Sequence, residues 1–222
     1  MGKSDMVNLL RSGVQGWNEW RNKNPQEIID LVEVDLEGAF LVGANLGHAN
    51  LKCASLVGAN LSEAILDGAD LCRADLKGAI IRGACLCGAS LDNSHLYNTD
   101  FGDADLGDTD FRKADLGCAN LTGARMRGAN LKGAILNNTI GNGSEIMSIR
   151  VDKWAVAYTA EVLQIGCERH PISWWWEFGD EEIARMHSDA LGLWHIWKPI
   201  LQQIIAAAPA TPTNEIEKRN GS

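Results

Sequence analysis

The chain lacks the features that mark membrane-spanning and secreted proteins. No apolar run reaches the length of about 18 residues that a transmembrane helix needs. The segment from Met1 to Met6 has no apolar signal core, and Met6 stands where a myristoylation motif requires Ser or Thr. We therefore expect a cytoplasmic protein that has no membrane partner.

The sequence also lacks the motifs of catalysis and cofactor binding. It contains no glycine-rich phosphate loop, no nucleophile elbow and no HExxH motif. Ser, His and Asp occur, but nothing in their spacing brings them together. We predict a protein that is not an enzyme and needs no cofactor. In the cytoplasm its six cysteines would be reduced thiols, although Cys85 and Cys87 flank one residue, so their oxidation is an alternative.

What the chain has in abundance is leucine at every fifth position. The repeat centres run from Leu36 to Leu136, which makes 21 successive units. Four centres carry another apolar residue: Ile81, Phe101, Phe111 and Met126. Ala stands two residues before most centres, and Gly often stands two residues after them.

A period of five fits neither a helix nor a continuous strand. Five residues advance an α-helix by about 500°, so the leucines would spiral around its axis. In a strand, an odd spacing would place successive leucines on opposite faces. Each unit must therefore contain a turn, and the sequence predicts a solenoid of stacked coils with the centres inside and Gly at the corners.

Two units show the pattern clearly, Ala44-Asn45-Leu46-Gly47-His48 and Ala69-Asp70-Leu71-Cys72-Arg73. They resemble the A(D/N)LXX unit of the pentapeptide-repeat family. This resemblance implies an all-β solenoid, a right-handed quadrilateral β-helix with four units per coil, in which residues 20 apart stack. We expect the β-helix over residues 31–140, an N-terminal helical cap over 1–30, a Trp-rich α+β module over 145–208 and a disordered tail over 209–222.

The segment before the repeat is predicted to be one helix. Residues 5–24 place Leu10, Val14 and Trp17 on one helix face, with Asp5 as the candidate N-cap. The stretch from Gly16 to Pro25 also resembles leaders that precede pentapeptide arrays. Because an open solenoid end exposes core and backbone, we expect this helix to cover the first coil.

The C-terminal segment is predicted to contain two strands, Trp154–Tyr158 and Val162–Ile165, and one helix with Asp180 as N-cap. Pro199 should break or kink that helix. Its apolar positions are Ile183, Ala190, Trp194, Trp197, Leu201 and Ile204. We expect this face to dock on the last coil, and pairing of two copies into a homodimer is the alternative. The segment resembles a module found beside pentapeptide arrays, for which the resemblance implies no activity.

Tryptophan is concentrated in this module, which holds six of the eight in the chain. Most should form its small core, and a surplus would leave an exposed aromatic patch of the kind that marks interfaces. The candidate interaction residues are Trp174, Trp175, Trp176, Trp194 and Trp197.

Cys167, His170 and His187 are candidate zinc ligands in the same module, because thiolate and imidazole bind zinc. His195 is a further candidate, but it lies about 12 Å from His187 if one helix holds both. We therefore predict no metal and keep a metal-binding module as an alternative.

Acidic residues cluster near the middle of the repeat, where Asp100, Asp105, Asp110 and Asp115 precede successive centres. The family resemblance places them outward on successive faces of one coil, as an acidic belt. Some pentapeptide-repeat proteins bind type II topoisomerases by presenting an acidic rod that mimics DNA. A mimic needs charge repeated along its axis, but residues 31–140 hold 14 acidic and 9 basic residues, a net charge of only −5.

Taken together, these patterns predict a non-enzymatic scaffold with an unknown protein partner and no direct contact with nucleic acid. Its rigid rod would present the C-terminal module for recognition. Inhibition or protection of DNA gyrase by mimicry is the alternative function.

Overall fold

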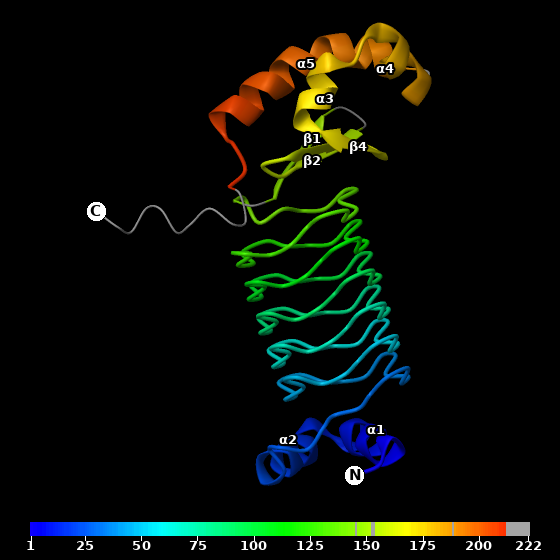
Figure 1. The fold of residues 1–222 in the computed structure, drawn as a ribbon, viewed down its shortest axis with the longest axis vertical. Helices are drawn as coiled ribbons and strands as arrows, with labels where there is room; N and C mark the ends of the chain where they lie inside the picture. The colour runs from blue at the N-terminus through cyan, green and yellow to red at the C-terminus, as the bar shows by residue number, and fades with distance from the viewer. Residues whose placement is uncertain (145, 152–153, 188, 212–222) are drawn as a thin grey trace, which may run out of the picture.

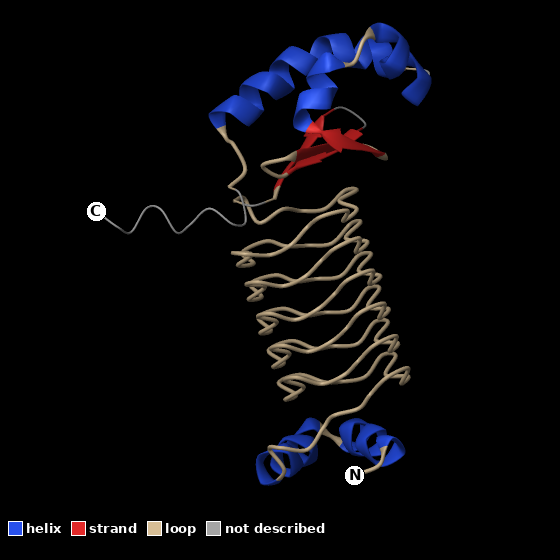
Figure 2. Cartoon of the chain, viewed as in Figure 1, coloured by secondary structure: helices blue, strands red, loops and turns tan. Residues whose placement is uncertain are grey.

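The computed structural model describes residues 1–144, 146–151, 154–187 and 189–211. The chain is elongated (Figure 1). Helices α1 (Lys3–Ser12) and α2 (Val14–Lys23) lie at one end of a stack of coils. A small sheet and three more helices lie at the other end, with the sheet next to the coils (Figure 2).

The stack is built from parallel pairing between residues 20 apart, beginning with Asp30 and Asn50 and ending with Asn120 and Ile140. Leu41 shows the pattern: its N–H donates to the Asn60 carbonyl at 2.7 Å, and its own carbonyl accepts from Ala44 at 3.0 Å. Each unit thus bonds to the next coil and closes its own turn. Because one coil takes 20 residues, it holds four units of five, as predicted.

The interior of the stack is apolar along its length. Nearly all the centres and the Ala residues two positions before them are buried. Leu31 is fully buried and donates its N–H to Asn50, so the repeat begins one unit earlier than Leu36. Phe101 and Phe111 are also fully buried and meet edge to face, with ring centroids 6.0 Å apart.

The corners depend on a left-handed residue two positions after each centre. From Glu33 to Asn138 every such residue has a φ between 55° and 82°, and 12 of them are not glycine. A type II turn requires this conformation at its third residue. The Asp or Asn that precedes the centre supports the turn, as where Asn60 Oδ1 accepts the Ser62 N–H at 3.0 Å.

The N-terminal segment forms two helices instead of the single helix predicted over 5–24. The chain breaks at Gly13, whose φ of 144° is accessible only to glycine, and the N-cap is Gly2 instead of Asp5. Leu10 and Trp17 are buried against the first coil as expected. The Trp17 indole N–H donates to the Asn45 carbonyl at 2.8 Å, which satisfies a group at the coil's open end.

The C-terminal sheet is an antiparallel meander of four strands. Two of them, β2 (Trp154–Tyr158) and β3 (Val162–Ile165), have the predicted bounds. The outer strands β1 (Met147–Val151) and β4 (Glu168–Pro171) were not predicted. Strand β4 reads Glu-Arg-His-Pro and has no alternation of apolar residues, so only the Gly166-Cys167 turn signals a hairpin.

The sheet separates two cores. Its coil-facing side includes Ala157, which packs in the core of the stack, and Gln164, whose Oε1 accepts the Leu136 N–H at 2.8 Å. The other side packs against helices α3 (Ile172–Glu177), α4 (Asp180–Met186) and α5 (Ala190–Ala207). Residues on this second side alternate with the first: Val156, Tyr158, Leu163 and Ile165.

The expected C-terminal helix needs three corrections. It is two helices, with α4 starting after Gly179 and ending at Met186. Pro199 does not break it, because α5 continues through this residue and is anchored on both sides by buried Trp194 and Leu201. The helix packs on the sheet and not on the last coil, which the sheet covers.

The expected disordered tail starts too early. Ala210 is buried in the C-terminal core, and the Thr211 N–H donates to the Ser144 carbonyl at 2.9 Å. Residues 212–222 of the predicted tail lie outside the described residues.

Candidate functional site

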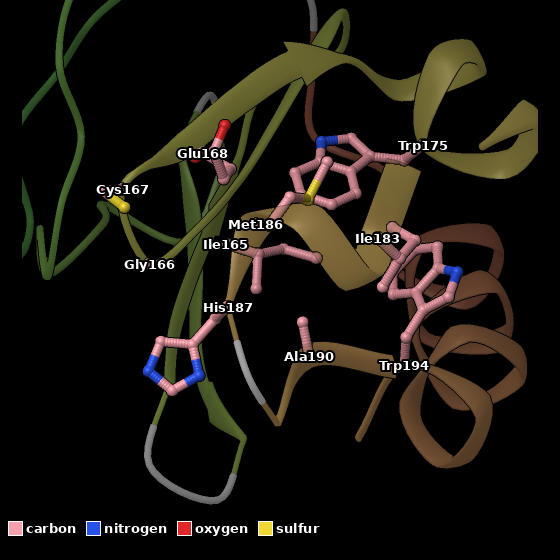
Figure 3. A pocket seen from close by; sticks show the side chains of 10 residues that line it. All are labelled: Ile165, Gly166, Cys167, Glu168, Trp175, Ile183, Met186, His187, Ala190 and Trp194. Atoms are coloured by element: carbon pink, nitrogen blue, oxygen red, sulfur yellow. The ribbon is translucent and has the colours of Figure 1, made fainter. Parts of the chain in front are cut away.

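A pocket of about 80 Å³ opens in the C-terminal module between the β3–β4 turn and the helices (Figure 3). Its wall is mostly apolar, with Trp175 and Trp194 held at a centroid distance of 5.4 Å. Glu168, Cys167 and His187 supply the few polar groups. Its full lining is Ile165, Gly166, Cys167, Glu168, Trp175, Ile183, Met186, His187, Ala190 and Trp194. Such a pocket suits an apolar group of modest size.

The five candidate tryptophans have different environments. Trp175 and Trp194 are buried, and the Trp175 indole N–H donates to the Leu163 carbonyl at 2.7 Å. Trp176 stacks on Trp194 at 6.1 Å and is partly buried, as is Trp197. Trp174 is the exposed one, with 54% of its surface accessible. Most of this set therefore serves the module's core.

The proposed zinc ligands do not come together. Cys167 lies on the β3–β4 turn, and His187 follows α4 on another part of the pocket (Figure 3). His170 lies on β4, where its ring packs among aromatic side chains, 5.4 Å from Trp175 and 5.0 Å from Phe178 between centroids. His195 is 3.4 Å from Asp180. Within the described ranges no group of three potential ligands at metal-binding distance includes these residues, so their geometry gives the zinc alternative no support.

A different cluster does lie within ligand distance, on the coil. Asp67, Cys85 and Cys87 each offer one ligand atom, and the three atoms lie within 4.8 Å of one another. Burial raises the pKa of both thiols and nearby carboxylates add to the effect, so that the pKa of Cys87 reaches about 11. Sequence inspection missed Asp67, although the 20-residue period places it one coil before Cys87.

The acidic belt has a structural task. Asp100, Asp105, Asp110 and Asp115 each accept, through Oδ1, the N–H of the residue two positions later, at 3.0 to 3.2 Å. Three of them also pair with an arginine, the tightest pair being Asp110 and Arg112 at 2.7 Å. Burial alone would raise the pKa of Asp110, but hydrogen bonds from Arg112 lower it. These carboxylates therefore support turns, and three of the four lie beside an arginine.

Comparison with protein families identifies the coil. The family model for pentapeptide repeats matches residues 29–66, 54–93, 89–128 and 104–140, which together span half of the chain. The chain belongs to the pentapeptide-repeat family. Proteins of this family fold as right-handed quadrilateral β-helices. The match ends at residue 140, so the C-terminal module lies outside it.

Solved structures with similarity to this pentapeptide-repeat protein include HetL, a protein involved in heterocyst differentiation regulation from the cyanobacterium Nostoc sp. strain PCC 7120. It is 34% identical over 51% of this chain and 64% of HetL, with a TM-score of 0.26. This chain thus spans less than two thirds of HetL.

Two further structures extend the comparison. A pentapeptide repeat protein from the Arabidopsis thaliana thylakoid lumen is 28% identical over 49% of this chain and 68% of its own, with a TM-score of 0.34. QnrB1, a plasmid-mediated fluoroquinolone resistance protein, is 16% identical over 52% of this chain and 85% of its own, with a TM-score of 0.21. No curated protein matches the chain.

The outward columns of this pentapeptide-repeat protein can be followed through the 20-residue pairing. Two columns hold three aspartates each, and in both the aspartates alternate with other residues: Asp30, Asn50, Asp70, Ser90, Asp110 and Asn130 in one, and Asp35, Ser55, Asp75, His95, Asp115 and Ile135 in the other. Another passes from Asp105 to Arg125. None of the paired columns is uniformly acidic. None of the helices in the described part of the chain is long and apolar enough to cross a bilayer.

Proposed function

We propose that this pentapeptide-repeat protein is a non-enzymatic interaction protein, in which a rigid β-helical rod presents the C-terminal module to a protein partner. The observation that carries the proposal is the apolar pocket of about 80 Å³ that Trp175 and Trp194 help to line. An apolar pocket that is already formed costs little to order on binding, and aromatic walls are typical of interface hot spots. We propose a cytoplasmic location for the protein.

The pocket size favours one anchoring side chain from the partner. A volume of this order holds an aliphatic or small aromatic group and leaves the rest of the partner on the rim. Trp174, which is exposed, and the exposed residues Ile196 and Ile200 of α5 are available for wider contact with a partner. A homodimer through α5 would use Ile196 and Ile200, and it is the alternative occupant of that surface.

The test fills the pocket with a larger side chain, so that no existing side chain has to be truncated. Ala190 lines the pocket, so Ala190→Leu should occupy it; Ala206→Leu makes the same change at an exposed position of the same helix. We expect a partner captured by the full chain to be lost with Ala190→Leu and kept with Ala206→Leu. If both variants still capture the partner, the pocket is not the binding site and the coil faces become the candidate surface. A mass by light scattering that stays at the 24.1 kDa of one chain over a range of concentrations would exclude the homodimer.

Mimicry of DNA toward a topoisomerase has less support. The belt carboxylates support turns and three are paired with arginine, and the acidic columns are interrupted. QnrB1 is a fluoroquinolone resistance protein, but at 16% identity its likeness is one of fold alone. A supercoiling assay with DNA gyrase distinguishes the two functions, and we expect no inhibition at micromolar protein.

A further inference from the structure

The thiol and carboxylate cluster on the coil has an arrangement that the proposed interaction function does not use. Cys85 and Cys87 stand on either side of Leu86, a fully buried centre, so both thiols lie on the outer side of the same wall. Asp67 lies one coil earlier, in the column of Cys87. Three potential ligands from two adjacent coils therefore meet on one face.

The backbone ladder holds these ligands in place. The Leu66 N–H donates to the Cys85 carbonyl at 2.7 Å, and the Gly68 N–H donates to the Cys87 carbonyl at 2.9 Å. These two bonds fix the segment around Asp67 against both cysteines. The Cys87 N–H also donates to Asp67 Oδ1 at 3.1 Å, which keeps the carboxylate beside the thiols. The ligand set is preorganised by the fold, which lowers the cost of binding an ion.

The dimensions of the cluster match those of a tetrahedral metal site. With a metal–sulfur bond of about 2.3 Å and a metal–oxygen bond of about 2.0 Å, two bound sulfurs lie about 3.8 Å apart. The three ligand atoms are now within 4.8 Å of one another. Side-chain rotations that move an atom by about an ångström would bring them to these separations, with no change in the backbone.

The charge around the cluster favours a cation. Asp67 forms no ion pair among the described residues, and Asp105, which pairs with Cys85 one coil later, lies near the Cys87 thiol. Arg125 is 3.6 Å from Asp105, but its side chain is 81% exposed, so this pair contributes little. Two carboxylates thus flank the two thiols, and the positive charge nearby is the weakly paired side chain of Arg125.

We propose that Asp67, Cys85 and Cys87 bind a thiophilic divalent cation such as Zn²⁺, with Asp105 or a water molecule as the fourth ligand. Each thiol loses its proton to the buffer as its sulfur–metal bond forms, so no oxidant or reductant takes part. Carboxylate and thiolate together select Zn²⁺ over Mg²⁺ or Ca²⁺, which prefer oxygen ligands alone.

A direct test measures zinc bound to the full chain after purification with a reductant and removal of metal. We expect one zinc ion per chain by mass spectrometric metal analysis after dialysis. The double variant Cys85→Ser/Cys87→Ser should lose it. The matched double variant Cys53→Ser/Cys72→Ser should keep it, because neither cysteine belongs to a group of three potential ligands among the described residues.

Two further readouts keep the proposal falsifiable if a double variant fails to fold. Asp67→Asn should weaken zinc binding by at least about tenfold, because it removes a charged ligand. In the unchanged chain, zinc should protect Cys85 and Cys87 from alkylation and leave Cys53 reactive. Absence of bound zinc, zinc retained by Cys85→Ser/Cys87→Ser, or equal alkylation of all cysteines would overturn the proposal. Ala190→Leu should bind zinc normally, so failure of the pocket hypothesis is a separate result.

Discussion

Replacing Trp17 with Ala should open the first coil and leave the middle of the rod closed. The Trp17 side chain is fully buried between α2 and the coil. Removing about 200 Å² of buried ring at about 25 cal/mol per Å² weakens the contact by about 5 kcal/mol. The measured range for such truncations, about 3–5 kcal/mol, is similar. The variant also loses the indole hydrogen bond to the Asn45 carbonyl, worth about 1 kcal/mol.

Hydrogen exchange locates this effect along the chain. In a solenoid each coil contacts only its neighbours, so the loss should be local. We expect amide protection at Leu31 and Asn45 to fall by up to about 4000-fold, since about 1.4 kcal/mol corresponds to a factor of ten and the loss is about 5 kcal/mol. Protection of Leu86, whose N–H donates to Asp105 in the middle of the stack, should not change.

Trp17→Phe is the matched control, because it keeps an aromatic ring in the site and loses the indole hydrogen bond together with a small part of the packing. Its effect at Leu31 should correspond to about 1 kcal/mol. Equal loss of protection at Leu31 and Leu86 in Trp17→Ala would refute the local argument and show that the rod unfolds as one unit. Unchanged protection at both positions would show that the N-terminal helices do not stabilise the coil.

Three further predictions concern the coil surface. Asp110→Asn keeps the turn acceptor and should cost less than Asp110→Ala by about 1 kcal/mol in urea unfolding; equal losses would show that the carboxylate acts through charge alone. The pKa of Cys87 is raised to about 11 in the fold, so its contribution to stability is full below the ordinary thiol pKa and is lost as the pH rises through about 11. In the presence of chelator and reductant, the melting temperature should fall less for Cys87→Ser than for the parent chain as the pH rises from the ordinary thiol pKa to about 11. Parallel curves of melting temperature against pH would contradict the raised pKa of Cys87. Gly128→Ala should destabilise by about 1–2 kcal/mol because its φ is +76° and its new Cβ would meet Asp108, and Asp108→Gly should restore part of that loss in thermal melts.

The coil was predictable because its determinants repeat. A five-residue period with apolar centres leaves one solution for the side-chain direction, and errors at single positions do not disturb it. Only its first unit was missed, since Ile29 and Val32 there replace the usual Ala and polar residues around Leu31. The pairing of Asp30 with Asn50 shows that this unit belongs to the stack.

The flanking modules were less predictable because single residues decide them. Gly13 divides one helical pattern into two helices through a φ of 144°, which hydrophobic periodicity does not report. The second predicted helix is likewise two, because α4 ends at Met186 and α5 begins at Ala190. At Pro199 a break or kink was predicted, but α5 continues through this residue. Packing of Trp194 and Leu201 in the C-terminal core outweighs the backbone hydrogen bond that proline cannot make.

The candidate metal ligands were also hard to predict from the sequence. Cys167 and His170 are close in sequence and were considered as candidate ligands, but the β3–β4 hairpin leaves Cys167 in the turn and pairs His170 with Leu163. Asp67 and Cys87 are far apart in the chain and adjacent in space. In a coil with a fixed period, adding 20 to a residue number identifies its neighbour, and this rule would have found the cluster.

The sheet at the C-terminal end separates the last coil from the helices, and its two sides carry different residues that cannot be exchanged. In β3, Gln164 satisfies the last coil while Leu163 and Ile165 lie among the tryptophans. Inserting or deleting one residue before Gln164 would turn leucine toward the exposed backbone of the coil and place an amide in the aromatic core. Strand parity therefore decides which side of the sheet faces the rod, and the partner that we propose for the pocket would be held on the side away from the coils.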